Sequence, residues 1–193
     1  LTGNHAPLLE AYGTRFINIH FKATATASPV VTLTSAASGV QFHECTFDGT
    51  AGTMTSGILA TASPFLQVVA CDFVGTFVTS YVTFGTGQVG FARIIGNRMA
   101  GVAAKGIVVG SGATMGTGWY PSISDNIIKA TGLTIDDDAN IFMVVNNRLI
   151  TDVDTDSDFN LGIDCKEEWA SGNLVTGSGT EGQCDTFPHT LIA

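Results

Sequence analysis

The chain has 193 residues, 45% of them hydrophobic, which is enough to bury the core of a single domain. Charged residues make up only 13%, about half the usual share, and the formal net charge is −9, with most acidic residues at or after Asp125. The lysines and arginines are scattered singly, which argues against nucleic acid as a partner, and no apolar run is long enough to span a membrane.

An internal repeat of about 26 residues organises the sequence. Its first column of apolar residues, each on a short predicted strand, contains Phe16, Phe42, Val68, Ile94, Ile123, Val144 and Ala170. A second apolar column follows five residues further along, at Phe21, Phe47, Phe73, Met99, Ile128, Leu149 and Val175. A fixed period in this range is typical of a solenoid.

A sharp bend is predicted between these two columns. The residues at the bend are Ile19, Cys45, Cys71, Asn97, Asn126, Asn147 and Asn173. Asn adopts the left-handed backbone conformation more readily than other non-glycine residues, so its recurrence favours a turn at this position. Stacked at the spacing of neighbouring strands, the side-chain amides could form a hydrogen-bonded ladder.

A third strand per coil is indicated by short runs of alternating apolar residues, such as VVTLTS and GIVVGSG. Its predicted column contains Val31, Ile58, Val82, Ile107, Leu133 and Leu161, and near the two ends of the chain Leu8 and Leu191 fit it as well. The runs FVTSYVTF and IFMVV are apolar on both strand faces, and we expect another subunit to cover their outer side.

These strands, with no segment of helical period, predict an all-β solenoid of about seven coils of ~26 residues, spanning 1–193 as one domain. Coil length, Asn at one bend and stacked Phe columns resemble the right-handed parallel β-helix of the pectin-lyase-like superfamily, and most closely its phage or viral tail-spike and particle-surface modules. Because an uncapped stack exposes unpaired strand edges, we expect a segment of a longer solenoid or a subunit whose ends a partner covers.

An outward-facing acid pair is the candidate catalytic site. Three residues past the third-column anchors stand Thr34, Thr61, Gly85, Gly110, Asp136 and Asp164. On neighbouring coils the carboxylates of Asp136 and Asp164 would lie roughly 5 Å apart, which suits a retaining glycosidase or a shared cation. The resemblance implies that this face forms the substrate groove of related enzymes, but their clustered Asp with Arg or Lys is missing over most of it.

Four aspartates on alternate residues suggest a calcium loop: Asp152, Asp154, Asp156 and Asp158. Counted from Asp152, however, the sixth and twelfth positions are Ser157 and Ile163, whereas an EF-hand needs Gly and Glu there. A solvated acidic loop is therefore favoured, and we expect no metal and no cofactor.

An expanded turn, GATMGTGWYPS, carries Trp119 and Tyr120, which could stack on a glycan, meet a neighbouring subunit or fold back onto the solenoid.

Smaller features follow from the same columns. Cys45 and Cys71 are expected to form a buried packing stack, and Asp72 and Arg98 a surface ion pair on adjacent coils. Cys165 and Cys184 could form a disulfide bond if the compartment is oxidising.

Three functions fit the sequence. The favoured one is a non-enzymatic structural or receptor-binding module of a viral or phage particle, on the virion or outside the cell, forming a homo-oligomer, with a trimer favoured, or contacting other particle proteins and surface polysaccharide. The alternatives are a polysaccharide lyase or glycoside hydrolase that uses Asp136 and Asp164, and a bacterial surface adhesin. Low charge and an outer face rich in Thr favour the first.

Overall fold

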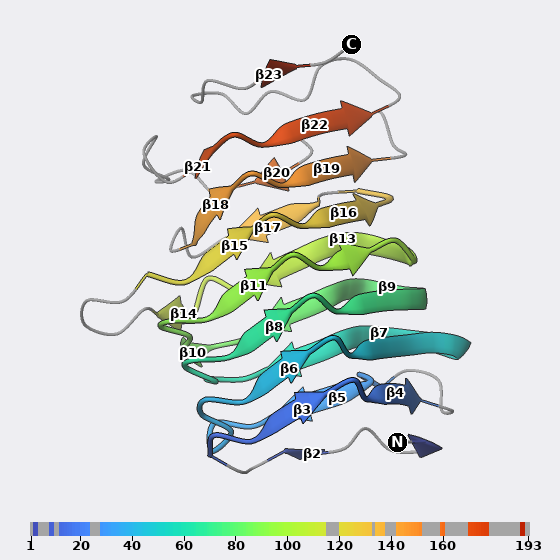
Figure 1. Ribbon diagram of the computed structural model, residues 1–193, viewed down its shortest axis with the longest axis vertical. Helices are drawn as coiled ribbons and strands as arrows, with labels where there is room; N and C mark the ends of the chain where they lie inside the picture. Colours follow the sequence, from blue (N-terminus) through green and yellow to red (C-terminus); the bar gives the residue numbers. More distant parts are fainter. Residues whose placement is uncertain are drawn as a thin grey trace.

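The structure is a computed structural model, and it describes residues 2–3, 8–9, 12–23, 28–114, 120–132, 134–137, 142–151, 159–160, 170–177 and 190–191. These residues form β-strands joined by turns, and no helix occurs among them. All strand pairs among the described residues are parallel, and the strands stack along one axis from β1 to β23 (Figure 1). The fold is a parallel β-solenoid, as the repeat predicted.

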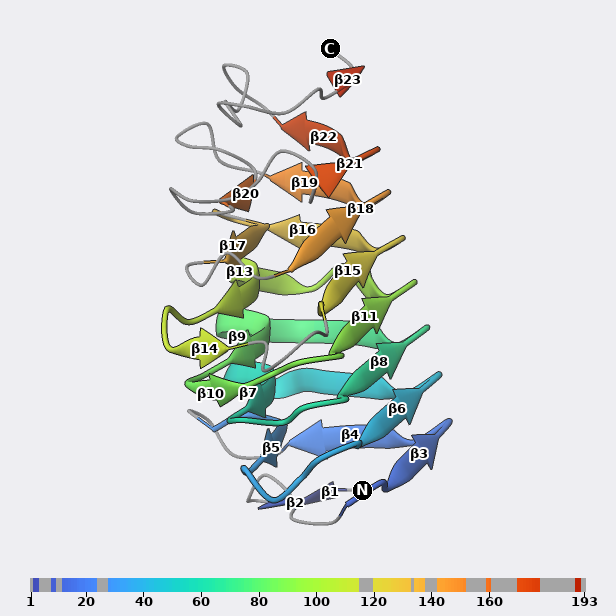
Figure 2. The ribbon, with the colours of Figure 1, turned by 90° about the vertical axis from the view of Figure 1, so that its left-hand side faces the viewer.

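Each coil contributes strands to three faces. The first face is a seven-stranded sheet, visible as one row of arrows in Figure 2. Its strands are β3 (Arg15–Ile17), β6 (Gln41–His43), β8 (Gln67–Val69), β11 (Arg93–Ile95), β15 (Ser122–Ser124), β18 (Met143–Val145) and β21 (Ala170–Ser171).

The second face begins after a sharp bend. Its strands are β1 (Thr2–Gly3), β4 (His20–Ala23), the first part of β7 (Thr46–Ala60) and of β9 (Asp72–Phe84), β12 (Arg98–Met99), β16 (Ile127–Ala130), β19 (Arg148–Thr151), β22 (Leu174–Gly177) and β23 (Thr190–Leu191).

The third face is continuous with the second because β7 and β9 run around the corner between them. It contains β2 (Leu8–Leu9), β5 (Val31–Leu33), the second parts of β7 and β9, β13 (Val102–Val109), β17 (Ile135–Asp137) and β20 (Phe159–Asn160). A short pair, β10 (Gly87–Gln88) and β14 (Ala113–Thr114), lies beyond it.

The first two predicted columns are confirmed residue by residue. Phe16, Phe42 and Val68 are aligned on the first face, and Phe21, Phe47 and Phe73 on the second. Their rings stack along the axis, with centroids 4.7 Å apart for Phe47 and Phe73, and meet edge to face across the core, 5.3 Å apart for Phe42 and Phe47. Each such pair adds about 0.5–1.5 kcal/mol beyond the burial of its area.

The Asn column forms the expected ladder, but it is not the left-handed residue of the bend. Positive φ falls one residue earlier, at Asn18, Glu44, Ala70, Gly96, Asp125, Asn146 and Gly172. The ladder asparagines are buried just inside the bend, and their amides bond along the stack: Nδ2 of Asn97 donates to Oδ1 of Asn126, and Nδ2 of Asn126 to Oδ1 of Asn147. Asn is therefore used for its amide rather than for its backbone freedom.

The cysteines occupy the same bend on earlier coils. Cys45 and Cys71 are buried and unbonded, and the backbone amide of Cys45 donates to Sγ of Cys71 over 3.4 Å. Burial raises the pKa of the Cys71 thiol to about 12, so it stays protonated. This confirms the predicted packing stack; Cys165 and Cys184 lie outside the described residues.

The third column is correct for four coils and then shifts. Val31, Ile58, Val82 and Ile107 are aligned, but Ile107 pairs with Ile135 and Ile135 with Phe159, rather than with Leu133 and Leu161. A two-residue shift keeps the same side chains inward, so alternation alone could not detect it.

The predicted positions of the two end leucines are also wrong. Leu8 pairs with Thr32, one residue away from the column, and Leu191 lies on the second face opposite Val175.

About four turns are supported rather than the seven expected. Residues 28–114 are described without interruption, whereas the coils after Thr114 are described only in parts of their strands. The segments between those parts lie outside the described residues.

The run FVTSYVTF is apolar on both faces for a local reason. The pairing register of β9 shifts between Phe77 and Ser80 against both neighbouring strands, and Tyr81 and Val82 are then buried consecutively. Tyr81 packs against Phe73 and Phe77, and its hydroxyl donates to the carbonyl of Lys129, 2.7 Å away. The chain itself therefore covers Tyr81, while Val78 remains exposed.

Candidate functional site

The candidate acid Asp136 lies on β17 of the third face, next to the core residue Ile135. The register places Val108 beside it on one side and Asn160 on the other, so its neighbour in the next coil is Asn160 and not Asp164. The expected adjacency of Asp136 and Asp164 rested on the anchors Leu133 and Leu161. The observed anchors, Ile135 and Phe159, lie two residues later and two residues earlier, so the register between these coils differs by four residues. Asp164 itself lies outside the described residues.

Asp136 has a basic partner that the sequence did not reveal. Its side chain is almost completely buried, and its Oδ2 accepts from Nζ of Lys105 on β13 of the preceding coil. Lys105 is aligned with Ser80 on β9, and Ser80 begins a row of hydroxyl groups. Its Oγ lies 2.5 Å from Oγ1 of Thr83, and that Oγ1 lies 3.2 Å from Oγ of Ser56. The columns read from the sequence did not predict this role of Lys105, because a register irregularity between Ala103 and Lys105 moves it out of the regular alignment.

This arrangement is an ion pair beside a row of hydroxyl groups. The Asp136 carboxylate accepts the hydrogen bond that Lys105 donates. Its aligned neighbour in the next coil, Asn160, carries an amide rather than the second carboxylate that the predicted acid pair requires. Catalysis by Asp136 and Asp164 therefore stays a prediction.

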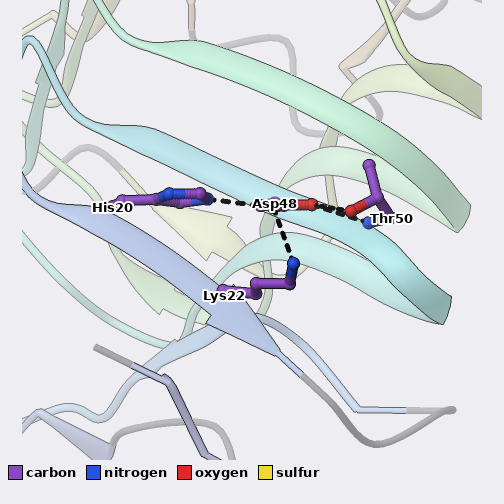
Figure 3. Close-up of polar contacts among 4 residues, drawn as sticks. All are labelled: His20, Lys22, Asp48 and Thr50. Atoms are coloured by element: carbon purple, nitrogen blue, oxygen red, sulfur yellow. Dashed lines mark hydrogen bonds and ion pairs between the residues drawn. The ribbon is translucent and has the colours of Figure 1, made fainter.

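A second buried carboxylate, Asp48 on β7, collects four polar contacts on the second face (Figure 3). Its Oδ2 lies 2.9 Å from Nε2 of His20 and 3.8 Å from Nζ of Lys22, both on β4. Its Oδ1 accepts from the amide and the hydroxyl of Thr50, at 2.8 and 2.5 Å. The Thr50 contacts form an Asx-turn where β7 departs from the register of β9, between Gly49 and Thr53.

The pKa of Asp48 results from opposing effects. Burial alone raises the pKa of this carboxyl, but the two hydrogen bonds from Thr50, the contact with His20 and the charge of Lys22 together lower it below the ordinary value. Because the folded pKa lies below the unfolded one, the ionised group stabilises the fold above pH about 4, and this contribution is lost as pH falls through the folded pKa.

Replacing Asp48 with Asn should lower the free energy of unfolding by about 2 kcal/mol at pH 7, because the charged hydrogen bonds are lost. The loss should shrink at pH 3, where the wild-type carboxyl begins to protonate, and urea unfolding at the two pH values measures both. Asp72→Asn is the matched control, since the confirmed ion pair of Asp72 with Arg98 is exposed, and it should cost less than about 1 kcal/mol. An equal loss at both pH values would contradict the assignment.

Tyr120 is exposed, and the residues at the corresponding position of the two preceding coils are aromatic as well, which the columns read from the sequence did not show. Gln67, Arg93 and Ser122 are aligned on the first face, and the residues two positions before them are Phe65, Phe91 and Tyr120. The rings of Phe65 and Phe91 are stacked, with centroids 5.1 Å apart and planes 20° apart. We call Phe65 and Phe91 the aromatic column; Trp119 lies outside the described residues.

Both members of this column have strained backbones. Phe65 and Phe91 have φ of 63° and 64°, a conformation that costs a bulky residue roughly 1–2 kcal/mol relative to Gly. On the two preceding coils the same position is occupied by Gly13 and Gly39, with φ of 67° and 71°. The turn therefore favours Gly, and a Phe residue at this position costs conformational free energy.

The calcium candidates Asp152, Asp154, Asp156 and Asp158 lie outside the described residues. Within the part of the chain that the structure describes, no three His, Cys, Asp or Glu side chains are grouped as they would be around a metal ion. The same part contains no helix that is long and apolar enough to cross a membrane.

Fold and contacts together define a class, the parallel β-solenoids with polar clusters on their outer faces. In comparisons with known proteins, no family model, no curated protein and no solved structure matches the chain.

Proposed function

We propose that the chain is a structural and receptor-binding module of a viral or phage particle, built as a right-handed β-helix of the pectin-lyase-like kind. One observation carries the proposal. Among the described residues, the two buried carboxylates, Asp48 and Asp136, each contact basic side chains, whereas the strained residue Phe65 is exposed to solvent at one corner. This distribution favours binding over turnover.

Composition and topology support the same proposal. Few charges and a regular stack suit a module that is buried against neighbours along part of its surface. A right-handed coil agrees with the strong preference of parallel strand connections for that hand. A homotrimer on the virion, with glycans as receptors and Tyr120 as one contact, is the form of the proposal that we favour.

Native mass tests the proposal. The protein isolated from its source should have three times the mass of its denatured subunit, or it should co-purify with particles. A monomer that cleaves polysaccharide would contradict the proposal and favour the enzymatic alternative. A monomer bound to a bacterial surface would favour the adhesin.

The enzymatic alternative has one specific observation in its favour, the Lys105–Asp136 ion pair on the outer side of the third face. A polysaccharide lyase or glycoside hydrolase built on this pair should lose cleavage in Asp136→Asn while keeping its fold. Release of reducing ends from acidic and neutral polysaccharides measures that activity.

A further inference from the structure

The aromatic column ends abruptly at Phe65, and the coil beside it carries no side chain at the same position. One side of the Phe65 ring is stacked on Phe91. In the next two coils on its other side the position is Gly39 and then Gly13. A Cβ added to Gly39 would meet only the backbone of Gly13, at 3.5 Å, and one added to Gly13 would meet nothing within 4 Å. Gly39 and Gly13 therefore leave an open strip of surface beside Phe65, which we call the ledge. It extends over two coils, roughly 10 Å at the usual strand spacing.

Packing on Phe91 explains only part of the position of the Phe65 ring. Its side chain is 44% exposed, so burial compensates only part of the backbone strain that Gly in the same turn avoids. Strained residues that are not required by the core are concentrated at ligand contacts. This exposed ring thus marks the ledge as a binding site.

Polar side chains border the ledge. Gln41 and Arg15 begin the strands of the first face two residues after Gly39 and Gly13, and they are aligned with each other. They offer an amide and a guanidinium group, which hydrogen-bond to hydroxyl or carboxylate oxygens. Tyr12, beside Gly13, is 81% exposed and adds a second ring at the far end.

The size of the ledge limits its ligand. Two coils by two or three residues give roughly 100 Å², far below the ~800 Å² that a stable protein interface buries on each partner. A nucleic acid is disfavoured because the chain carries a net charge of −9. A small ring with one apolar face and polar edges fits both the area and the bordering groups.

We infer that the ledge binds a saccharide unit, with a pyranose ring stacked on the free side of Phe65 as the next rung of the aromatic column. The C–H groups on one face of the sugar carry partial positive charge and are attracted to the negative face of the ring. Gln41 and Arg15 then bond its hydroxyl or carboxylate groups. This inference deepens the proposed function by naming the receptor class and the contact, and it rests on that proposal for the role of glycan binding.

The experiment compares four proteins on an array of neutral and uronate-containing oligosaccharides. Wild type and Phe65→Tyr should bind, because both keep the ring, while Phe65→Gly should bind at least tenfold more weakly. Val78→Ala, which removes an exposed apolar side chain from β9 and not from the ledge, is the control and should bind as wild type does. If wild type also binds neutral sugars, Arg15 bonds to hydroxyl groups. If it binds only uronate-containing sugars, Arg15 bonds to a carboxylate group.

Unfolding of the variant would not explain a loss of binding. Phe65→Gly removes a strained side chain, so it should lower the unfolding temperature by less than about 3 °C. No binding by wild type, or equal binding by wild type and Phe65→Gly, would overturn the inference. An equal loss of binding in Val78→Ala would overturn it as well, because the loss would not be specific to the ledge. Native mass separates the two proposals. A particle-bound trimer without glycan binding defeats only the inference, whereas a monomer that binds through Phe65 defeats only the particle assignment.

Discussion

Asn147→Ala is expected to lower the free energy of unfolding by about 4 kcal/mol, which places this polar residue among the most important for stability. Nδ2 of Asn147 donates to the carbonyls of Ile123 and Val145 and to Oδ1 of Asn173, each at 3.0 Å. Its Oδ1 accepts from the backbone amide and from Nδ2 of Asn126. Alanine removes these bonds and leaves buried donors of Asn126 without a partner, at about 1–3 kcal/mol for an unsatisfied group.

The preceding residue is the matched control for this prediction. Asn146 is exposed and has φ of 55°, a left-handed conformation that Gly adopts without strain. Asn146→Gly therefore removes the same kind of side chain without straining the backbone. It should change the unfolding free energy by less than about 0.5 kcal/mol. Urea unfolding of both variants measures the difference. If Asn147→Ala cost less than about 1 kcal/mol, the ladder would not stabilise the bend.

Tyr81→Ala is expected to cost about 4–5 kcal/mol. The ring is fully buried against Phe73 and Phe77, and its register neighbours on the two adjacent coils, Gly57 and Gly106, have no side chains with which to fill the cavity. The backbone cannot close the gap easily, because a Cβ on Gly106 would already lie 2.1 Å from the carbonyl oxygen of Thr134. The hydrogen bond from Tyr81 to Lys129 is lost as well.

Two further substitutions separate the parts of this effect. Tyr81→Phe keeps the ring and removes only the hydroxyl, so it should cost about 1–2 kcal/mol, mostly because the carbonyl of Lys129 loses its donor. Tyr120→Ala removes a half-exposed ring and should cost less than about 1 kcal/mol. Urea unfolding orders the three variants. A loss for Tyr81→Ala no larger than that for Tyr120→Ala would mean that Tyr81 is not an anchor of the corner.

The sequence predicted the parts of the fold that depend on repetition. An apolar residue at Phe16 recurs at Phe42 and Val68 because each coil must bury the same inward position, and the structure aligns these residues as expected. The asparagine ladder was likewise visible, since stacked amides need the same residue on successive coils. A pattern that every coil repeats can be recognised without knowing the contacts.

Tertiary structure alone decided the features that break the repeat. Alternation could not show that Ile135, rather than Leu133, pairs with Ile107, because a shift by two residues leaves the same faces inward. Together with a second shift of two residues, from Leu161 to Phe159, this shift replaced Asp164 by Asn160 beside Asp136. A register irregularity brought Lys105 to the same carboxylate.

By itself, then, the amino-acid sequence determined the class of fold, the two apolar columns and the ladder at the bend, because burial at a fixed coil length demands a periodic pattern. Only the tertiary structure placed Lys105 against Asp136, His20 against Asp48 and Phe65 at the end of a stack of rings. These contacts join residues on different coils at turns and register shifts, where neither period nor alternation constrains which side chains meet.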